Sequence, residues 1–113
     1  MKINVRNKKT YKGKGEYIGR PSPLGNPFKI NKTIDRSTSI SMYTRYITDA
    51  IMNEGFASEH HEEIINELNR LFSLLVRHRT LTLICFCSPK LCHGDIIKQL
   101  LLNKYYTGEY IIT

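Results

Sequence analysis

Cysteine and histidine, two residue types that can bind metals or react, gather in one short segment. Cys85, Cys87, Cys92 and His93 form the pattern C-x-C-x4-C-H. Thiolate and imidazole are the usual ligands of zinc, so Cys87, Cys92 and His93 make a candidate metal site, with Cys85 expected in the protein core. Against a metal, the spacing departs from the common C-x2-C pairs, and the adjacent Cys92 and His93 would strain to ligate one ion. Zinc therefore stays an open alternative, and the pattern identifies no other cofactor.

The same segment also supports covalent or acid–base chemistry without a metal. A thiol just before a helix N-terminus, with basic residues such as Lys90 and Arg20 nearby, would have its thiolate form favoured. His93 could then exchange a proton with a ligand. The predicted catalytic residues are thus Cys92, His93 and Asp95. The alternative is that the cysteines pack as small hydrophobic side chains.

A second polar segment, YIGRPSPLGNPF, spans residues 17–28. Its prolines and glycines restrict and shape the backbone. A guanidinium together with backbone amides suits a phosphate or carboxylate. The segment is neither a Walker loop nor a G-x-G-x-x-G fingerprint, and its alternative role is simply to redirect the chain. The predicted ligand-binding or phosphate-binding residues are Gly19, Arg20, Ser22, Gly25 and Asn26.

A strand and a helix should position the Cys/His segment. Residues 81–87 form an almost unbroken apolar run without charge, which predicts a central strand covered on both faces. Residues 94–105 have apolar side chains at helical spacing. A strand, a tight loop and a helix make one arm of an α/β layer, and in such sheets ligands bind at the carboxyl ends of the strands. The Cys/His segment is expected at that end.

The rest of the chain predicts a small α/β fold. We expect a single domain over residues 1–113, with a short, mostly parallel, Rossmann-like sheet and about three packed helices in two or three layers. The other predicted elements are strands at residues 2–6, 16–19 and 109–112, a helix that follows the polar residues 31–41 and stops at Gly55, and a helix that Ser58 caps and that ends near Arg79.

Positive charge is concentrated in the N-terminal third. The chain has a formal net charge of +7, and residues 1–36 hold ten Lys/Arg against two acids, a net of +8. This imbalance suggests an anionic partner, whereas a solvated lysine-rich loop is the alternative. No apolar run is long enough to cross a bilayer, and the N-terminus has no signal-peptide core. We therefore expect no membrane partner and a cytoplasmic protein, in the host cytoplasm if it is encoded by a phage.

The two polar segments resemble domain-of-unknown-function family 4326, a family of small bacteriophage and bacterial proteins. Its members share a YIGR-x-S-x-LGNPF-like loop and a C-x-C-x-P-x-x-CHGD-like loop in the order found here, at residues 17–28 and 85–95. The family name records no activity, so the resemblance implies a shared site and no reaction. Carried over to this sequence, that site comprises Gly19, Arg20, Ser22, Gly25, Asn26, Cys87, Cys92, His93, Gly94 and Asp95.

Three functions are consistent with these features. The first is a site for a phosphate-bearing ligand, a nucleotide or a nucleic-acid-derived group, held between the Arg20 loop and the Cys92–His93 loop; whether the protein is also an enzyme that modifies this ligand stays open. The second is a DNA- or RNA-binding module without catalysis, with zinc as an optional structural ion. The third is a phage protein that inhibits a host protein.

Overall fold

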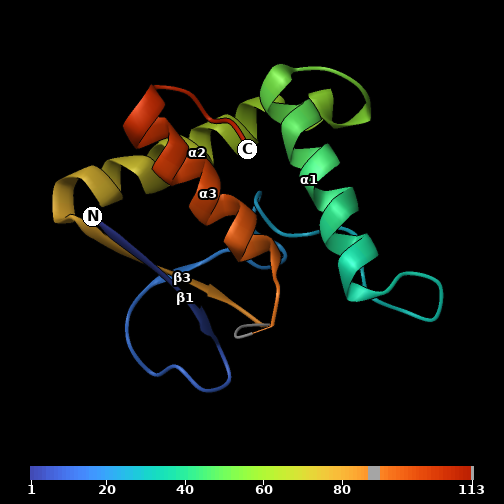
Figure 1. Cartoon of the computed structure of the whole chain (residues 1–113), viewed down its shortest axis with the longest axis horizontal. Helices are drawn as coiled ribbons and strands as arrows, with labels where there is room; N and C mark the ends of the chain where they lie inside the picture. The colour runs from blue at the N-terminus through green and yellow to red at the C-terminus, as the bar shows by residue number, and fades with distance from the viewer. Residues whose placement is uncertain (87–89, 113) are drawn as a thin grey trace.

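The computed structural model describes residues 1–86 and 90–112 of an α/β domain (Figure 1). The sheet has three parallel strands in the order β1-β3-β2. The predicted α/β fold, with a short parallel sheet and three helices, is confirmed. The elements are β1 (Lys2–Asn7), β2 (Glu16–Tyr17), α1 (Arg36–Met52), the short 3-10 helix η1 (Phe56–His60), α2 (His61–His78), β3 (Thr80–Cys85) and α3 (His93–Thr107).

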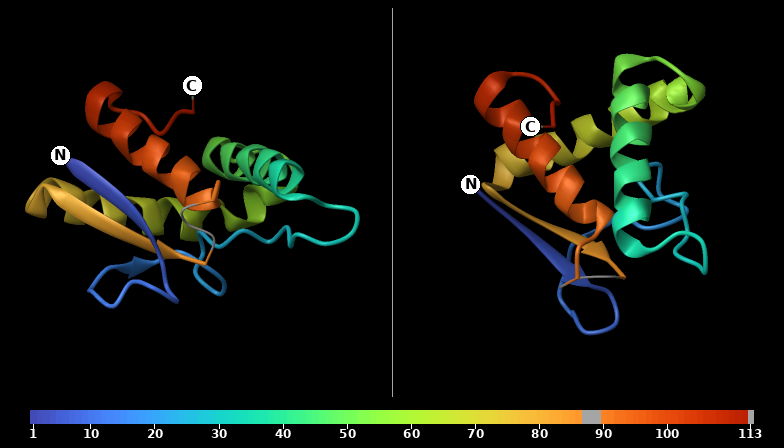
Figure 2. Two further views of the ribbon diagram at one scale, coloured as in Figure 1. Left: turned by 60° about the horizontal axis from the view of Figure 1, so that its bottom comes forward. Right: turned by 45° about the vertical axis from the view of Figure 1, so that its right-hand side comes forward.

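The central strand β3 is buried on one face only. Leu81, Leu83 and Cys85 point into the core, as expected for Cys85, and Ile3 of β1 lies beside Leu81 on the same face. The opposite face is partly exposed, and the side chain of Phe86 just beyond the strand is 50% exposed. The prediction of a strand covered on both faces is wrong, because the helices gather on one side of the sheet and make two layers (Figure 2).

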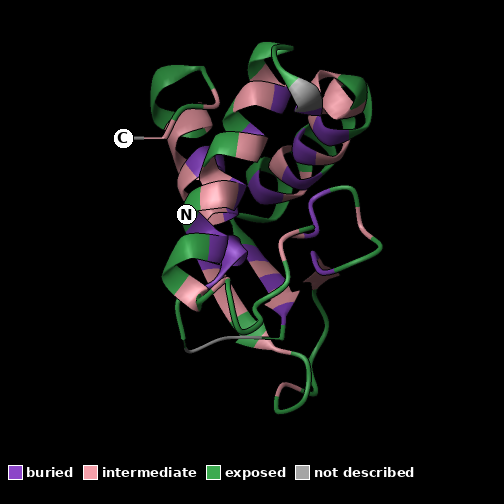
Figure 3. Cartoon of the chain, turned by 90° about the vertical axis from the view of Figure 1, so that its right-hand side faces the viewer, coloured by how far each residue is buried: buried purple, intermediate pink, exposed green. Residues whose placement is uncertain are grey.

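The packing of α2 and α3 against the sheet forms the core. The buried side chains of α2 recur at helical spacing, at Ile64, Leu68, Leu71 and Leu75. Figure 3 shows such buried residues alternating with exposed ones along the helices. Within the described residues, no helix is long and apolar enough to span a membrane.

The helix boundaries differ from the predicted ones because local caps decide them. Asp35 caps α1 by accepting a hydrogen bond from the backbone nitrogen of Thr38 at 2.7 Å, so the polar residues 36–41 belong to the helix. The helix ends at Asn53 in a left-handed conformation, two residues before the predicted stop at Gly55. Ser58 does not cap α2, because it lies inside η1 and the helix begins at His61.

The chain after α3 does not add to the sheet. Gly108 ends α3 in a left-handed conformation, and residues 109–112 form no strand. Tyr110 instead packs its ring edge-on against Phe72 of α2, with ring centroids 6.5 Å apart. The predicted last edge strand is therefore wrong, because burial against α2 replaces pairing with the sheet.

Candidate functional site

The carboxyl ends of all three strands meet at one edge of the sheet, because the strands are parallel (Figure 1). A hydrogen bond at this edge joins the two polar segments: His93 Nε2 lies 2.7 Å from the backbone oxygen of Ile18. A carbonyl oxygen can only accept, so His93 Nε2 carries the hydrogen and donates it. The segments at residues 17–28 and 85–95 are thus in direct contact.

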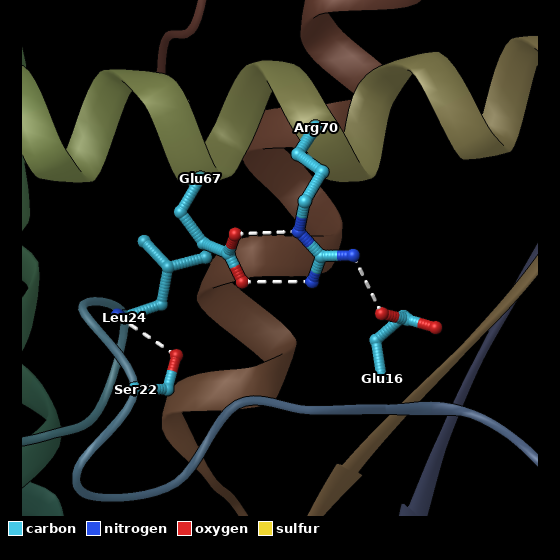
Figure 4. A network of polar contacts seen from close by, with 5 residues as sticks. All are labelled: Glu16, Ser22, Leu24, Glu67 and Arg70. Carbon is cyan, nitrogen blue, oxygen red and sulfur yellow. Dashed lines mark hydrogen bonds and ion pairs between the residues drawn. The ribbon is translucent and has the colours of Figure 1, made fainter.

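Backbone contacts within the Arg20 loop, residues 19–26, set its shape. The backbone nitrogen of Ser22 donates to Gly19, and that of Gly25 donates to Ser22, each at 2.8 Å. A Cβ on Gly25 would lie 2.8 Å from the backbone nitrogen of Arg20, so glycine alone lets the ends of the loop approach. Ser22 Oγ accepts from the backbone nitrogen of Leu24 at 3.3 Å (Figure 4). Ser22 and Gly25 therefore shape the loop.

Helix α1 holds the Arg20 loop in place. The buried hydroxyl of Tyr43 donates to the backbone oxygen of Leu24 at 2.8 Å. Burial raises the pKa of Tyr43 well above its usual value, so the phenol stays a neutral donor. Asn26 Nδ2 donates to Ser39 Oγ at 2.9 Å, and this hydroxyl donates to the backbone oxygen of Phe28 at 2.6 Å. The amide of Asn26 therefore ties the loop to α1.

Cys92 and Asp95 together cap the N-terminus of α3. The sulfur of Cys92, which is wholly buried, accepts from the backbone nitrogen of Gly94 at 3.2 Å. The carboxylate of Asp95 accepts from the backbone nitrogen of Cys92 at 3.0 Å, which completes a capping box. A Cβ on Gly94 would lie 2.9 Å from Val5 Cγ1 and 3.1 Å from Ile18 Cδ1. Glycine here lets α3 start directly against β1 and the chain after β2.

The imidazole of His93 is 6% exposed and uses both ring nitrogens within the protein. Nε2 donates to Ile18, and Nδ1 lies 3.7 Å from the sulfur of Cys92. Desolvation lowers the pKa of His93 below its usual value of 6.5, and the nearby positive charge of Arg20 lowers it further. The ring is therefore neutral at pH 7, and its first role is to join the two segments.

A cleft of about 520 Å³ opens where these segments meet. Residues from both segments, from the following loop and from the start of α1 contribute to its walls. Its lining comprises Tyr17, Gly19, Arg20, Asn26, Phe28, Lys29, Ile30, Arg36, Ser39, Ile40, Phe86 and His93.

The charges in this cleft are all positive. Arg20, Lys29 and Arg36 line it, and none of the described lining residues is Asp or Glu. Arg36 Nη1 donates to the backbone oxygen of Leu91 at 3.2 Å. Among the residues that the structure describes, the side chains of Arg20 and Lys29 have neither an ion-pair partner nor a hydrogen-bond partner. Cations without a nearby carboxylate create a positive field that favours an anionic ligand.

One wall of the cleft is aromatic. The rings of Tyr17 and Phe86 meet edge to face, with centroids 5.9 Å apart. Lys8 Nζ lies 4.5 Å from the ring centroid of Tyr17 and 5.8 Å from that of Phe86. Phe28 adds a third ring to the lining. Half-exposed rings of this kind can stack on a flat, apolar ligand group.

The predicted site residues divide into two groups in the structure. Gly19, Arg20, Asn26 and His93 line the cleft. The others lie behind it or are not described: Ser22 and Gly25 shape the loop, Cys92 and Asp95 cap α3, and Cys87 lies outside the described residues.

Sequence reasoning missed five lining side chains that carry charge or an aromatic ring: Tyr17, Phe28, Lys29, Arg36 and Phe86. Lys29 and Arg36 were counted in the basic third but not placed, and Tyr17 and Phe28 lay inside the recognised segment without a role. Phe86 was assigned to the strand. Position could have indicated three of them, since Tyr17 ends β2, Phe86 directly follows β3 and Arg36 begins α1, whereas no such signal marks Phe28 or Lys29.

Residues 1–86 and 90–112 contain no cluster of side chains that could bind a metal ion. No group of three or more His, Cys, Asp or Glu side chains there is arranged to hold an ion. Two of the three predicted ligands, Cys92 and His93, are adjacent and buried, and the third, Cys87, is not described.

A second hollow, the groove, lies between α1 and η1 and has a volume of about 580 Å³. Among its polar side chains, Arg45 and His60 have partners: Arg45 Nε lies 3.2 Å from Asp49 Oδ2, and His60 Nδ1 lies 2.7 Å from Glu63 Oε1. The groove is largely apolar and shares Phe28 with the cleft. Its lining comprises Pro27, Phe28, Ser41, Met42, Arg45, Tyr46, Asp49, Ala57 and His60.

The family comparison agrees with the motifs that form the cleft. The model of the family described as "Domain of unknown function (DUF4326)" matches residues 3–103, which include both polar segments and all three strands. No curated protein and no solved structure gives a significant match. The chain belongs to the DUF4326 family.

Proposed function

We propose that the cleft binds a phosphate-bearing ligand, a nucleotide or a nucleic-acid-derived group. The observation that carries this proposal is the trio Arg20, Lys29 and Arg36 in a cleft whose described lining residues include no carboxylate. A guanidinium can bind a phosphate through two parallel hydrogen bonds, and an ammonium adds a point charge. The position at the carboxyl ends of parallel strands is where α/β sheets bind ligands.

The aromatic wall supports a nucleotide over a bare phosphate. Tyr17 and Phe86 line the cleft that the three cations also line, so one ligand can present an anionic end and a flat ring together. Stacking of a base on an aromatic side chain contributes about 1–3 kcal/mol. A nucleotide is the common ligand that combines both groups.

The contacts of the two segments favour binding over chemistry as the first activity to test. Cys92 is buried and caps α3, Asp95 completes that cap, and His93 is engaged at both ring nitrogens. Their catalytic roles stay predictions, which depend on a ligand or a rearrangement that brings one of these groups to the reacting atom. Among the described residues of this site, the charged side chains without a protein partner are those of Arg20 and Lys29.

The test measures binding of inorganic phosphate and of the four ribonucleoside 5′-monophosphates by titration calorimetry and amide chemical shifts. Arg20→Ala should weaken the bound monophosphate about tenfold or more, the loss expected for a charged hydrogen bond. Arg20→Lys keeps the charge but not the fork, and should lie between Arg20→Ala and the parent protein.

The matched control is Arg77→Ala on the exposed end of α2, which removes the same charge far along the chain from the cleft residues. It should leave the affinity within about twofold, because exposed charges at a distance are screened by salt. The proposal fails if none of these ligands binds, or if Arg77→Ala and Arg20→Ala weaken binding equally.

A further inference from the structure

We infer that the ligand is a single strand of nucleic acid, with one nucleotide in the cleft and neighbouring phosphates on the basic loop, residues 8–14. This inference rests on the proposed function and extends it from one nucleotide to a polymer. Three features support it. The lysines of the basic loop have no ion-pair partners, the nearby Glu16 is paired with a helix residue instead, and the loop contacts the aromatic wall of the cleft.

The basic loop has lysines and no acid. Its sequence, KKTYKGK, contains Lys8, Lys9, Lys12 and Lys14, and all four are exposed. In the described part of the chain, none of the four takes part in an ion pair. Four adjacent positive charges without counter-charges favour a polyanion, since each phosphate bound to a lysine releases condensed counterions from the strand.

The nearest acid in the chain does not neutralise the basic loop. Glu16, two residues beyond the loop, accepts from Arg70 Nη1 of α2 at 2.8 Å. Arg70 also donates to both carboxylate oxygens of Glu67, at 2.7 and 2.9 Å (Figure 4). These contacts raise the pKa of Arg70 and pair the charge of Glu16 with the helix. The lysines of the loop therefore keep their full positive field.

The basic loop begins at the wall of the cleft. Tyr17 pairs with Ile84 in the sheet register, so both side chains face away from the helix layer. Lys8 stands over the ring of Tyr17 on that outer side, at 4.5 Å. At its other end the loop leads to Gly15, which packs close to the backbone oxygen of Thr82. The basic loop thus runs from Lys8, at the aromatic wall of the cleft, to Lys14, which lines a hollow together with Thr82 of β3 and with Leu74 of α2.

This arrangement suits a strand with unpaired bases. A mononucleotide in the cleft presents a single phosphate group, whereas a strand has further phosphates that the lysines of the basic loop can bind. Phe86 is half exposed beside Lys8, and aromatic side chains next to a basic track are the usual means of holding a single strand without sequence preference. In a duplex the bases are already stacked and paired, so the rings would gain nothing.

The experiment compares one mononucleotide with oligonucleotides of increasing length, as single-stranded DNA, single-stranded RNA and duplex DNA, at several salt concentrations. We expect a single strand of about eight nucleotides to bind at least about tenfold more tightly than the mononucleotide, with a steeper loss of affinity as salt rises. Comparing single-stranded DNA with single-stranded RNA tests whether the protein discriminates between the two sugars, since the lysines contact only phosphates.

The decisive variant is Lys9→Ala/Lys12→Ala/Lys14→Ala. Lys8 is left in place because it packs on Tyr17. Each phosphate contact on a single strand contributes about 0.7 to the slope of log affinity against log salt, so losing three should reduce that slope by about two. The control Lys2→Ala/Arg77→Ala/Lys98→Ala removes the same charge elsewhere and should leave most of the slope intact.

The outcomes separate the two proposals. If the mononucleotide binds through Arg20 but longer strands bind no more tightly, the inference is overturned and the nucleotide site stands. If strands bind with a steep salt slope and Arg20→Ala does not weaken that binding, the strand does not enter the cleft and the inference is overturned. If Arg20→Ala leaves binding of the mononucleotide unchanged as well, the nucleotide site is overturned too. Duplex binding as tight as single-strand binding overturns the choice of a single strand.

Discussion

The cleft and the groove have similar volumes, about 520 and 580 Å³, and they share the side chain of Phe28. Their chemistry differs. In the groove, the charge of Arg45 is matched by Asp49 on the next turn of α1, and the lining is otherwise mainly apolar. In the cleft, three cations line the walls, and the part of the lining that the structure describes contains no carboxylate.

This difference separates residues that build the molecule from residues that are left for a ligand. Most polar groups in the two segments around the cleft already bond to the protein: Asn26 to Ser39, His93 to Ile18, and Asp95 to Cys92. Among the described residues that line the cleft, the charged side chains without such a partner are those of Arg20 and Lys29. A hollow of a given size is thus a weak guide to function, whereas charge that the fold leaves uncompensated is a strong one.

The largest effect is expected from a substitution that distorts the cleft and leaves the groove unchanged. Gly25→Ala places a Cβ against the backbone of Arg20, which cannot move without reshaping the loop. We expect the free energy of unfolding, measured by chemical denaturation, to fall by about 1–3 kcal/mol, as in other overpacked sites. Binding of a monophosphate should weaken as well, because Arg20 moves with the loop.

Gly13→Ala is the matched control. Its Cβ would meet only the outer end of the Tyr11 side chain, which can turn away at little cost. Its effect on stability should stay within about 0.5 kcal/mol. Equal losses in the two variants would contradict the role given to Gly25.

Two tyrosines on α1, one behind the cleft and one lining the groove, allow a second comparison, with an expected effect on stability of intermediate size. Tyr43→Phe removes the hydroxyl that bonds to Leu24 behind the cleft and should reduce the free energy of unfolding by about 1 kcal/mol. Tyr46 lines the groove and, in the described chain, its hydroxyl has no hydrogen bond. Tyr46→Phe should therefore change stability by less than about 0.5 kcal/mol. A larger loss of unfolding free energy for Tyr46→Phe than for Tyr43→Phe would contradict the structural role given to the Tyr43 hydroxyl.

The smallest effect is a dependence of stability on pH. The pKa of His93 is lowered in the folded protein, mainly by desolvation, so below pH 6.5 the unfolded chain takes up a proton that the folded chain resists. Stability should fall as the pH drops below 6.5 and level off once the folded protein also binds the proton. Above pH 6.5 His93 is neutral in both the folded and the unfolded chain, so its destabilising effect disappears.

His93→Gln isolates the histidine contribution, because glutamine can still donate a hydrogen bond to Ile18 but does not titrate. The difference in unfolding free energy between the parent protein and His93→Gln should shrink with falling pH. A constant difference between pH 5 and pH 8 would show that His93 does not contribute this proton linkage.

The sheet could be predicted because each signal was local. The uncharged apolar run of β3 and the alternation of Ile3 and Val5 in β1 identify strands, and parallel strands must bring their carboxyl ends together. The meeting of the two polar segments follows from that topology. The start of α1 was misplaced because its first turns are rich in Ser and Thr, weak helix formers, and a capping bond from Asp35 outweighs them.

The roles of individual polar residues could not be predicted, because their partners are distant in sequence. Asn26 looks like a ligand-binding amide until Ser39, thirteen residues away, is seen to occupy it. His93 looks like a catalytic base until Ile18, 75 residues away, is placed beside it. The sequence shows which side chains can form hydrogen bonds. Only the fold shows whether another part of the protein already forms those bonds.

The position of β3 between β1 and β2 has a consequence for how the protein is made. Neither N-terminal strand pairs with the other, and both pair with a strand that is 80–85 residues into the chain. During synthesis, the N-terminal third, with its net charge of +8, leaves the ribosome before its partner strand exists. The cleft is therefore completed only after β3 and the start of α3 have been translated, when His93 can reach Ile18.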